Sequence, residues 1–321
     1  MTRKRFIFCL IPAMLAAHLA TAQTFPSKPV RIVVPFGAGG VADLTARTVA
    51  QKLSESLGQP VVVDNKPGAG GVVAGDAVAK SEPDGHTLLL MSNATAVSAG
   101  LFKSLPFDAV RDFAPVSTLG FFDIAIITPA ESKFKTLGEL LAFAKANPGK
   151  LNLGSINIGS TQNLTAELFK STSGADMQIV PFNGTPAVIT ALRGGQIDVA
   201  VEILGPVLPQ IRANALRALV VTSDKRAAVL PEVPTAKESG LPTFVASSWN
   251  ALAAPAKTPQ AVIARLNKEI AAAVNSPDVK KKLADLNVEA RTSSPEQAAE
   301  LLASETKRWG EVITRAKIPT Q

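Results

Sequence analysis

Short apolar runs alternate with helix-type patterns along this chain, and glycine or small polar residues mark many of the changes from run to helix. In the first such unit, residues 30–34 read VRIVV, a β-branched run typical of a buried strand. Pro35 then ends ladder pairing, and Leu44, Leu53 and Leu57 recur at roughly helical spacing over residues 41–57. Strands that alternate with helices are typical of α/β proteins with parallel sheets.

The same alternation predicts the other elements. We expect further strands at 60–64, 87–91, 151–154, 178–181, 197–201 and 216–222, and helices at 72–80, at 137–146, after Gly159, and up to Arg193. Thr185 and Pro186 are typical of an N-cap and a first helical residue. Beyond residue 255 the pattern is helical, with start signals at residues 258, 276 and 294.

The glycine turn at residues 37–40 joins a predicted strand to a predicted helix, and three interpretations of it are open. It can be a purely structural turn. It can bind a carboxylate or other small anion, because free N–H groups and the helix dipole point the same way. It can also bind a dinucleotide, since Gly37, Gly39 and Ala42 fit a loose GxGxxA fingerprint and Asp64 ends the next strand.

The first 22 residues are typical of a secretory signal peptide. Arg3, Lys4 and Arg5 form a basic region, residues 6–19 are mostly apolar, and Ala20-Thr21-Ala22 is an A-x-A cleavage signal. The apolar stretch is too short to span a bilayer, and no later apolar run reaches spanning length. We therefore expect a soluble protein that is exported to a bacterial periplasm.

Composition narrows the chemistry of the mature chain. Cleavage lowers the formal charge from +7 to about +4, and no basic run with interleaved aromatics follows, so we expect no nucleic-acid partner. The mature chain has no cysteine and no tyrosine, and its single histidine, His86, is expected to be exposed. No GxSxG elbow is present and no acidic pair stands out, although residue counts leave a carboxylate-only hydrolase open. We expect no catalytic residues, no metal and no cofactor.

About 300 mature residues favour two domains. Apolar residues 121–128 are a candidate crossing between them, and residues 247–255 are a candidate return crossing. We predict one lobe from residues 23–124 plus 240–321 and a second lobe from residues 125–239.

Several ordered motifs closely resemble the Bug family, the periplasmic substrate-binding receptors of tripartite tricarboxylate transporters. They are FPSKPVRIVVPF at 25–36, GQPVVVDNKPGAGG at 58–71, PDG at 83–85, GST at 159–161 and GGQID at 194–198. The resemblance covers essentially the whole mature chain. It implies a two-domain, type II periplasmic-binding-protein fold of the α/β class, with the ligand in the inter-domain cleft. It also implies a small organic carboxylate as ligand, and a large and a small integral membrane subunit as partners.

A second turn of small residues, at 159–161, also precedes a predicted helix. Combined with the resemblance, the turns at 37–40 and 159–161 predict a carboxylate clamp with one turn on each lobe. The predicted ligand-binding residues are Phe36, Ala38, Gly39, Gly40, Asn93, Ser155, Gly159, Ser160, Thr161, Phe182, Thr185 and Glu202.

Three departures from the family pattern fall in the predicted pocket. The frequent SAGNGSxxH is SINIGSTQN at 155–163, the frequent VPYKG is VPFNG at 180–184, and the strand-end aspartate is Glu202. Glu202 could reach an amine on the ligand or repel a second carboxylate, and it could equally be a solvated or capping acid. Our hypothesis is an unusually apolar pocket that prefers a monocarboxylate, either aromatic or amine-bearing.

Two other classes remain as alternatives. One is an exported α/β enzyme with a nucleotide cofactor, and the other is a ligand-sensing module for a membrane sensor. We expect the receptor to be a monomer.

Overall fold

The structure is a computed structural model that describes residues 25–315 and 317–320. The predicted signal peptide lies outside these residues. In chain order the elements are β1 (Val30–Val34), α1 (Val41–Leu57), β2 (Val61–Asn65), η1 (Ala69–Gly71), α2 (Val72–Ala79), β3 (Thr87–Met91), α3 (Asn93–Leu101), β4 (Phe113–Pro129), α4 (Leu137–Ala146), β5 (Asn152–Ile156), α5 (Thr161–Ser173), β6 (Gln178–Phe182), α6 (Thr185–Arg193), β7 (Val199–Ile203), α7 (Leu204–Arg212), β8 (Leu216–Val221), β9 (Ser247–Pro255), α8 (Gln260–Asn275), α9 (Pro277–Asp285), β10 (Val288–Ala290) and α10 (Pro295–Arg315).

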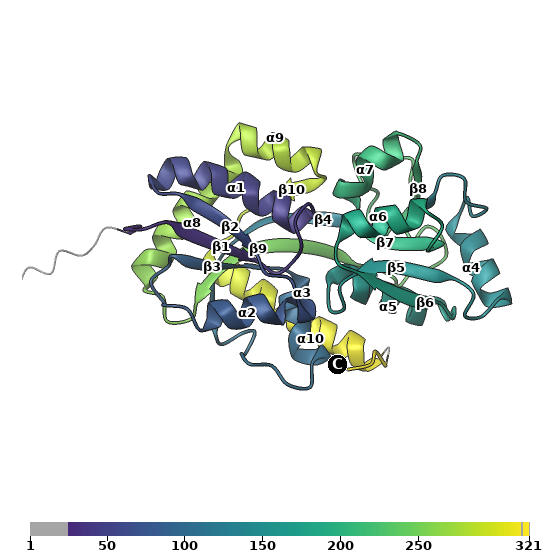
Figure 1. Ribbon diagram of the computed structural model, residues 1–321, viewed down its shortest axis with the longest axis horizontal. Helices are drawn as coiled ribbons and strands as arrows, with labels where there is room; N and C mark the ends of the chain where they lie inside the picture. The colour runs from purple at the N-terminus through teal and green to yellow at the C-terminus, as the bar shows by residue number, and fades with distance from the viewer. Residues whose placement is uncertain (1–24, 316, 321) are drawn as a thin grey trace, which may run out of the picture.

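These elements form two α/β lobes that share the long strand β4 (Figure 1). In the first lobe, β1 lies between β2 and β3 in parallel register, with Ile32 opposite both Val63 and Leu88. Val30, Ile32, Val33 and Val34 are fully buried, as a β-branched run in the middle of a covered sheet requires. Helices α1 and α8 pack against each other beside this sheet.

The second lobe repeats the parallel arrangement around β5, which lies between β6 and β7. The last part of β4 pairs with β7 and β8 in antiparallel register. The sheets therefore contain both parallel and antiparallel pairs. The expectation of parallel sheets is correct for the pairs that β1 forms with β2 and β3, and for those that β5 forms with β6 and β7. Within the described residues, no helix combines the length and the apolar character needed to span a lipid bilayer.

Residues 247–255, the predicted return crossing, form a strand at the point where the chain re-enters the first lobe, and their role as a crossing stays a prediction. They form β9, which pairs with β3 on one side and with residues 113–123 of β4 on the other. Just before β9, the N–H of Ala246 donates to Thr222 (2.9 Å), whose own N–H donates to Ile124 of β4 (2.8 Å).

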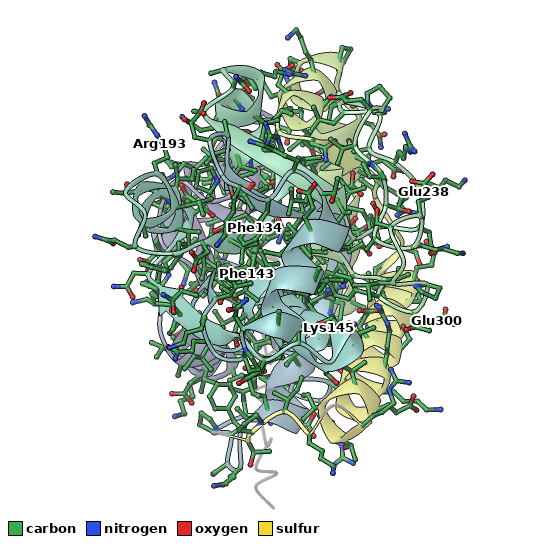
Figure 2. All side chains as sticks on the ribbon, turned by 90° about the vertical axis from the view of Figure 1, so that its right-hand side faces the viewer. Phe134, Phe143, Lys145, Arg193, Glu238 and Glu300 are labelled. Atoms are coloured by element: carbon green, nitrogen blue, oxygen red, sulfur yellow. The ribbon has the colours of Figure 1, made fainter. Side chains whose placement is uncertain are left out.

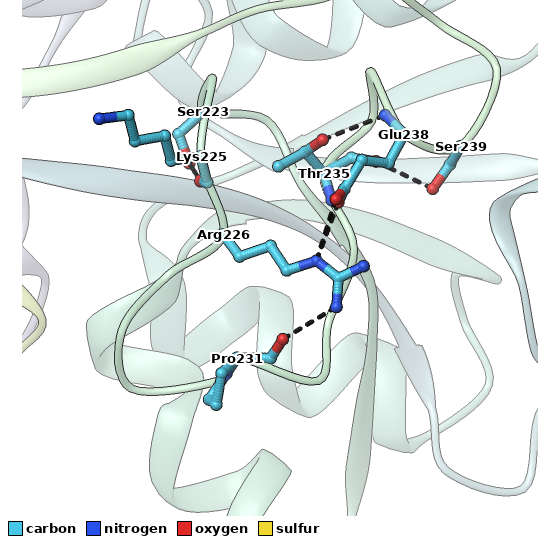
Figure 3. Close-up of polar contacts among 7 residues, drawn as sticks. All are labelled: Ser223, Lys225, Arg226, Pro231, Thr235, Glu238 and Ser239. Atoms are coloured by element: carbon cyan, nitrogen blue, oxygen red, sulfur yellow. Dashed lines mark hydrogen bonds and ion pairs between the residues drawn. The ribbon is translucent and has the colours of Figure 1, made fainter.

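Polar contacts hold the long loop between β8 and β9 in place (Figure 3). Arg226 donates to the Glu238 carboxylate at 3.0 Å and to the Pro231 carbonyl at 3.0 Å. Thr235 and Glu238 exchange two hydrogen bonds, of 2.7 and 3.1 Å, in the manner of a capping box. These contacts pair backbone N–H and C=O groups that are not hydrogen-bonded within a helix or strand.

Helix α4 closes the far end of the second lobe, with Phe143 on the helix and Phe134 on the segment before it (Figure 2). Their ring centroids are 5.3 Å apart, and the Lys133 ammonium lies 3.6 Å from the Phe143 centroid. This aromatic pair anchors the start of α4 on the side away from the first lobe.

His86 is buried, so the prediction that it is exposed is wrong. Its Nε2 accepts a hydrogen bond from the Ser27 N–H at 3.1 Å, and its ring lies 4.9 Å from that of Phe25. Its Nδ1 lies 3.2 Å from the Asp84 carboxylate. The first described residues of the chain therefore fold over the histidine, a long-range contact that the local sequence does not show.

Candidate functional site

Five helix N-termini meet at a cavity between the two lobes. Gly40 precedes α1 and Ser92 precedes α3 on the first lobe, while Thr161 of α5, Gly184 before α6 and Ile203 before α7 come from the second. The N-terminus of a helix carries a partial positive charge and unpaired N–H groups. Their convergence therefore favours an anion at this place.

The wall of the cavity is otherwise apolar or neutral. Its remaining lining residues are Phe36, Gly37, Val41, Ala42, Phe122, Ile156, Asn157, Gln162, Thr185, Ser248 and Asn250. None of the lining side chains carries a formal charge. The cavity has about 450 Å³ of empty space, part of which is open to solvent.

Helix α1 has an open N-terminus, as α6 and α7 of the second lobe also have, whereas serine side chains cap α3 and α5. No side chain caps α1, and the N–H groups of Val41 and Ala42 have no acceptor among the described residues. In α5, the Ser160 hydroxyl accepts from the N–H of Asn163 at 3.1 Å. In α3, Ser92 is part of a capping box. The N–H groups of Val41 and Ala42 are thus available to a ligand on the first-lobe side of the cavity.

Asp43 stabilises the glycine turn before α1 and does not accept hydrogen bonds from the N–H groups of Val41 and Ala42. Its carboxylate accepts from the Gly39 N–H at 3.0 Å and from Arg47 at 2.9 Å. Burial alone would raise the pKa of the Asp43 carboxyl, but the hydrogen bonds from Arg47, Gly39 and Asn65 together lower it below its ordinary value. Asp43 was not among the predicted residues, although an acidic residue in a first helical turn is a recognisable signal.

The two lobes touch around the cavity. The Ser248 hydroxyl donates to the Thr161 hydroxyl at 3.2 Å. A Cβ on Gly37 would lie 3.0 Å from the carbonyl oxygen of Asn183, so the first glycine turn lies directly against the second lobe. The structure is therefore closed around the cavity.

Glu202 lies behind the wall of the second lobe and is fully buried. Its Oε2 accepts from Thr185 Oγ1 at 3.0 Å, from Gln162 Nε2 at 3.4 Å and from the Ile203 N–H at 3.3 Å. Its Oε1 is buried and has no partner. Burial raises the pKa of the Glu202 carboxyl to about 7, and the three hydrogen bonds only partly oppose this shift.

Four of the predicted ligand-binding residues line the cavity: Phe36, Gly40, Thr161 and Thr185. Thr185 is not the N-cap of α6, as the sequence predicted, because Gly184 takes that position and Pro186 lies one place further into the helix. The Thr185 hydroxyl is consequently free to donate to Glu202.

The other predicted residues lie behind or beside the cavity wall. Ser155 accepts from Asn163 Nδ2 at 3.3 Å, and the Asn93 side chain donates to the Ser247 carbonyl at 2.8 Å. The N–H of Gly159 donates to Asn163 Oδ1 at 3.2 Å, and a Cβ on Gly159 would lie 3.1 Å from Gly70 of the first lobe. Ser160 caps α5, as described above. Whether any of them contacts a ligand stays a prediction.

Three predicted residues are partly or largely solvent-exposed. Ala38 and Gly39 are exposed at the tip of the first glycine turn, where a Cβ on Gly39 would lie 3.7 Å from Pro186. Phe182 ends β6 and packs against the apolar core of the second lobe.

Ser248 and Asn250 line the cavity from β9, and neither was among the predicted residues. Residues 247–255 were predicted only as a crossing, so their side chains were not considered. Asp64, the acidic residue of the dinucleotide interpretation, forms ion pairs with Arg31 (3.5 Å) and Lys66 (3.6 Å) instead. Among the residues that the structure describes, no three His, Cys, Asp or Glu side chains are grouped as a metal site requires.

Comparison with known proteins gives consistent matches over nearly the whole chain. The family model described as the tripartite tricarboxylate transporter family receptor matches residues 45–318. Protein BugT of Bordetella pertussis is 38% identical over 302 residues, which is 93% of this chain and 93% of that protein.

Solved structures with the same fold include proteins with bound carboxylates. A Rhodopseudomonas palustris protein solved with adipate has a TM-score of 0.88 at 30% identity and covers 92% of this chain and 100% of its own. MatC from the same organism, solved with bound malate, has a TM-score of 0.86 at 33% identity, with 90% and 100% covered. The periplasmic binding protein BugD has a TM-score of 0.88 at 30% identity, with 92% and 100% covered.

Proposed function

This chain belongs to the tripartite tricarboxylate transporter receptor family, and we propose that it captures a small carboxylate-bearing ligand between its two lobes. The family is one of solute-binding receptors rather than enzymes. The enzyme with a nucleotide cofactor is therefore not retained as an alternative.

The observation that carries the proposal is the open N-terminus of α1 on the cavity wall. A carboxylate there accepts from the N–H groups of Val41 and Ala42, which have no other acceptor among the described residues. A hydrogen bond to a charged group contributes roughly 1.5–3 kcal/mol. Because Thr161 and Thr185 face the same cavity from the second lobe, a ligand held by both lobes stabilises the closed state over the open one.

We propose a ligand with a single carboxylate and an apolar body. Phe36, Phe122, Ile156 and Ile203 supply apolar surface, and no lining side chain offers a positive charge to a second carboxylate. The ligands named for the two solved relatives, adipate and malate, are both dicarboxylates, so they are the natural comparison compounds.

The remaining parts of the proposal concern the cell. The chain is exported by its signal peptide, acts in the periplasm as a monomer, and delivers its ligand to a large and a small integral membrane subunit. Deletion of the gene tests this part: ligand uptake is lost if the receptor serves transport. Normal uptake combined with a lost transcriptional response to the ligand would favour the sensing alternative.

A thermal-shift screen against several hundred carboxylates tests binding. The protein is first unfolded and refolded, so that any co-purified ligand is removed. Binding to the native state at a hundredfold excess over Kd stabilises it by about 2.7 kcal/mol. Monocarboxylates are expected to give the largest shifts, with adipate and malate smaller. A flat screen would overturn the carboxylate proposal, and tight citrate binding with no response to monocarboxylates would overturn the preference.

A further inference from the structure

The second-lobe wall of the cavity is backed by a carboxylate that the proposed carboxylate site does not use. Glu202 is fully buried, and the two side chains between it and the cavity are Thr185 and Gln162. No charged side chain is among its hydrogen-bond partners in the described part of the chain, so a neighbouring cation does not neutralise it. Its Oε1 is left without a partner.

An ionised carboxylate accepts hydrogen bonds and has no hydrogen to give. Above pH 7, where Glu202 is ionised, the Thr185 hydroxyl therefore donates its one hydrogen to Glu202 and offers the cavity only lone pairs. Gln162 turns an N–H toward Glu202, which leaves its carbonyl oxygen free. The side chains of Thr185 and Gln162 therefore offer the cavity two acceptor oxygens and one spare N–H, with the unpaired Glu202 Oε1 buried behind them.

Resting on the carboxylate-receptor function above, we propose that Glu202 makes this receptor select ligands that carry a hydroxyl or ammonium group away from their carboxylate. The carboxylate lies at α1, and the donor group of the ligand meets Thr185 and Gln162. A ligand that lacks the donor leaves buried acceptors unpaired, which a site built for hydrogen bonding rejects strongly. A second carboxylate at this wall meets like charge.

Glu202 acts here as a positioning residue, because it reaches the ligand through Thr185 and Gln162. This differs from the direct contact that the sequence predicted. In Glu202→Gln, the new amide can donate to Thr185, which frees the threonine hydrogen for the cavity. The substitution therefore changes which ligands bind and does not merely weaken all of them.

The experiment measures dissociation constants for carboxylates paired by shape, at pH 8, by titration calorimetry on refolded protein. The pairs are 4-hydroxybutyrate and 4-aminobutyrate, each against pentanoate, and 4-hydroxybenzoate against 4-methylbenzoate. In the pair with the tightest member, the donor-bearing ligand is expected to bind at least about tenfold more tightly. Glu202→Gln is expected to reduce that ratio to about threefold or less, and Thr185→Val to reduce it as well.

Glu167→Gln is the matched control, because Glu167 is a half-buried carboxylate on α5 that does not line the cavity. It should leave the ratio unchanged. A wild-type ratio of one or below overturns the inference and leaves the carboxylate receptor standing, as does a ratio that survives both Glu202→Gln and Thr185→Val. If no carboxylate binds in this panel or in the wider screen, the proposed function fails and the inference falls with it.

Discussion

The Ser248 hydroxyl donates a hydrogen bond of 3.2 Å to the Thr161 hydroxyl, and this contact joins the two lobes at the cavity. Ser248 lies on β9 of the first lobe, and Thr161 is the first residue of α5 in the second. Both side chains are buried. The bond and the closed cavity therefore form together, so changes at either residue act on ligand binding through closure.

Ser248→Ala should weaken carboxylate binding by about three- to tenfold, because a neutral hydrogen bond contributes roughly 0.5–1.5 kcal/mol. Calorimetry with the best ligand from the screen measures this loss. Thr161→Val should add little when Ser248 is already alanine, since both changes remove the same bond. Ser304→Ala, on the exposed face of α10, is the control. Fully additive losses would show that the two hydroxyls are not coupled.

Gly40→Val should weaken ligand binding at least tenfold while changing the free energy of unfolding of the empty protein by less than about 1 kcal/mol. A Cβ on Gly40 meets nothing within 4 Å, and the backbone there has φ −83°. The side chain therefore fits the protein but intrudes on the cavity. Gly39→Val is a poorer probe, because φ +84° strains a β-branched residue.

Gly138→Val provides the comparison for that test, since it lies in the first turn of α4 and its Cβ has one neighbour, at 3.9 Å. It should leave the dissociation constant unchanged. If Gly40→Val costs stability as much as binding, the first glycine turn is purely structural.

Glu202→Gln should remove a pH-dependent cost to stability. Burial raises the pKa of this carboxyl to about 7 in the folded protein, against an ordinary value of 4.5. Below pH 4.5 both states hold the proton, and between pH 4.5 and 7 the unfolded chain loses it first. This group therefore lowers the free energy of unfolding as pH rises, by on the order of 3 kcal/mol above pH 7.

Urea denaturation at pH 4.5 and pH 7.5 measures the effect as a difference between variant and wild type. Relative to wild type, the free energy of unfolding of Glu202→Gln should be higher at pH 7.5 than at pH 4.5. The exposed Glu300→Gln is the control and should show no such shift. An unchanged difference would mean that Glu202 ionises freely in the folded protein.

Gly205→Ala should disfavour the closed state. A Cβ there would overlap the carbonyl oxygen of Leu286, which belongs to the other lobe. The lobes can relieve this overlap by moving apart, so we expect ligand affinity to fall at least tenfold and the radius of gyration in solution scattering to rise. Gly310→Ala, whose Cβ meets nothing within 4 Å, should change neither. If Gly205→Ala leaves the ligand affinity unaltered, the contact between Gly205 and Leu286 does not contribute to closure.

The local patterns of the sequence predict most of the elements, and the resemblance to the Bug family is confirmed by the family match and by BugT. The helix after the first glycine turn has the predicted bounds, since Pro35, the glycines and Gly58 punctuate it at both ends. The two-lobe periplasmic-binding-protein fold is confirmed by the solved relatives. The exact lobe boundaries stay predictions.

What the sequence misses are relationships between distant residues. Strand β9 was predicted only as a crossing, because the strands that it pairs with, β3 and β4, lie more than a hundred residues away. Ser248 and Asn250 were missed for that reason. Glu202 was predicted to contact the ligand, but its position behind Thr185 and Gln162 depends on how α5 and α6 pack on β7. No local pattern encodes that packing.

The central claim is that a carboxylate binds where the open N-terminus of α1 faces the second lobe. The most direct measurement is titration calorimetry of the refolded mature protein, and of its Gly40→Val variant, with the best carboxylate from the screen. The account predicts one binding site per chain, with the affinity lost in Gly40→Val at unchanged stability. Equal affinity in both proteins, or no carboxylate binding to either, would contradict it.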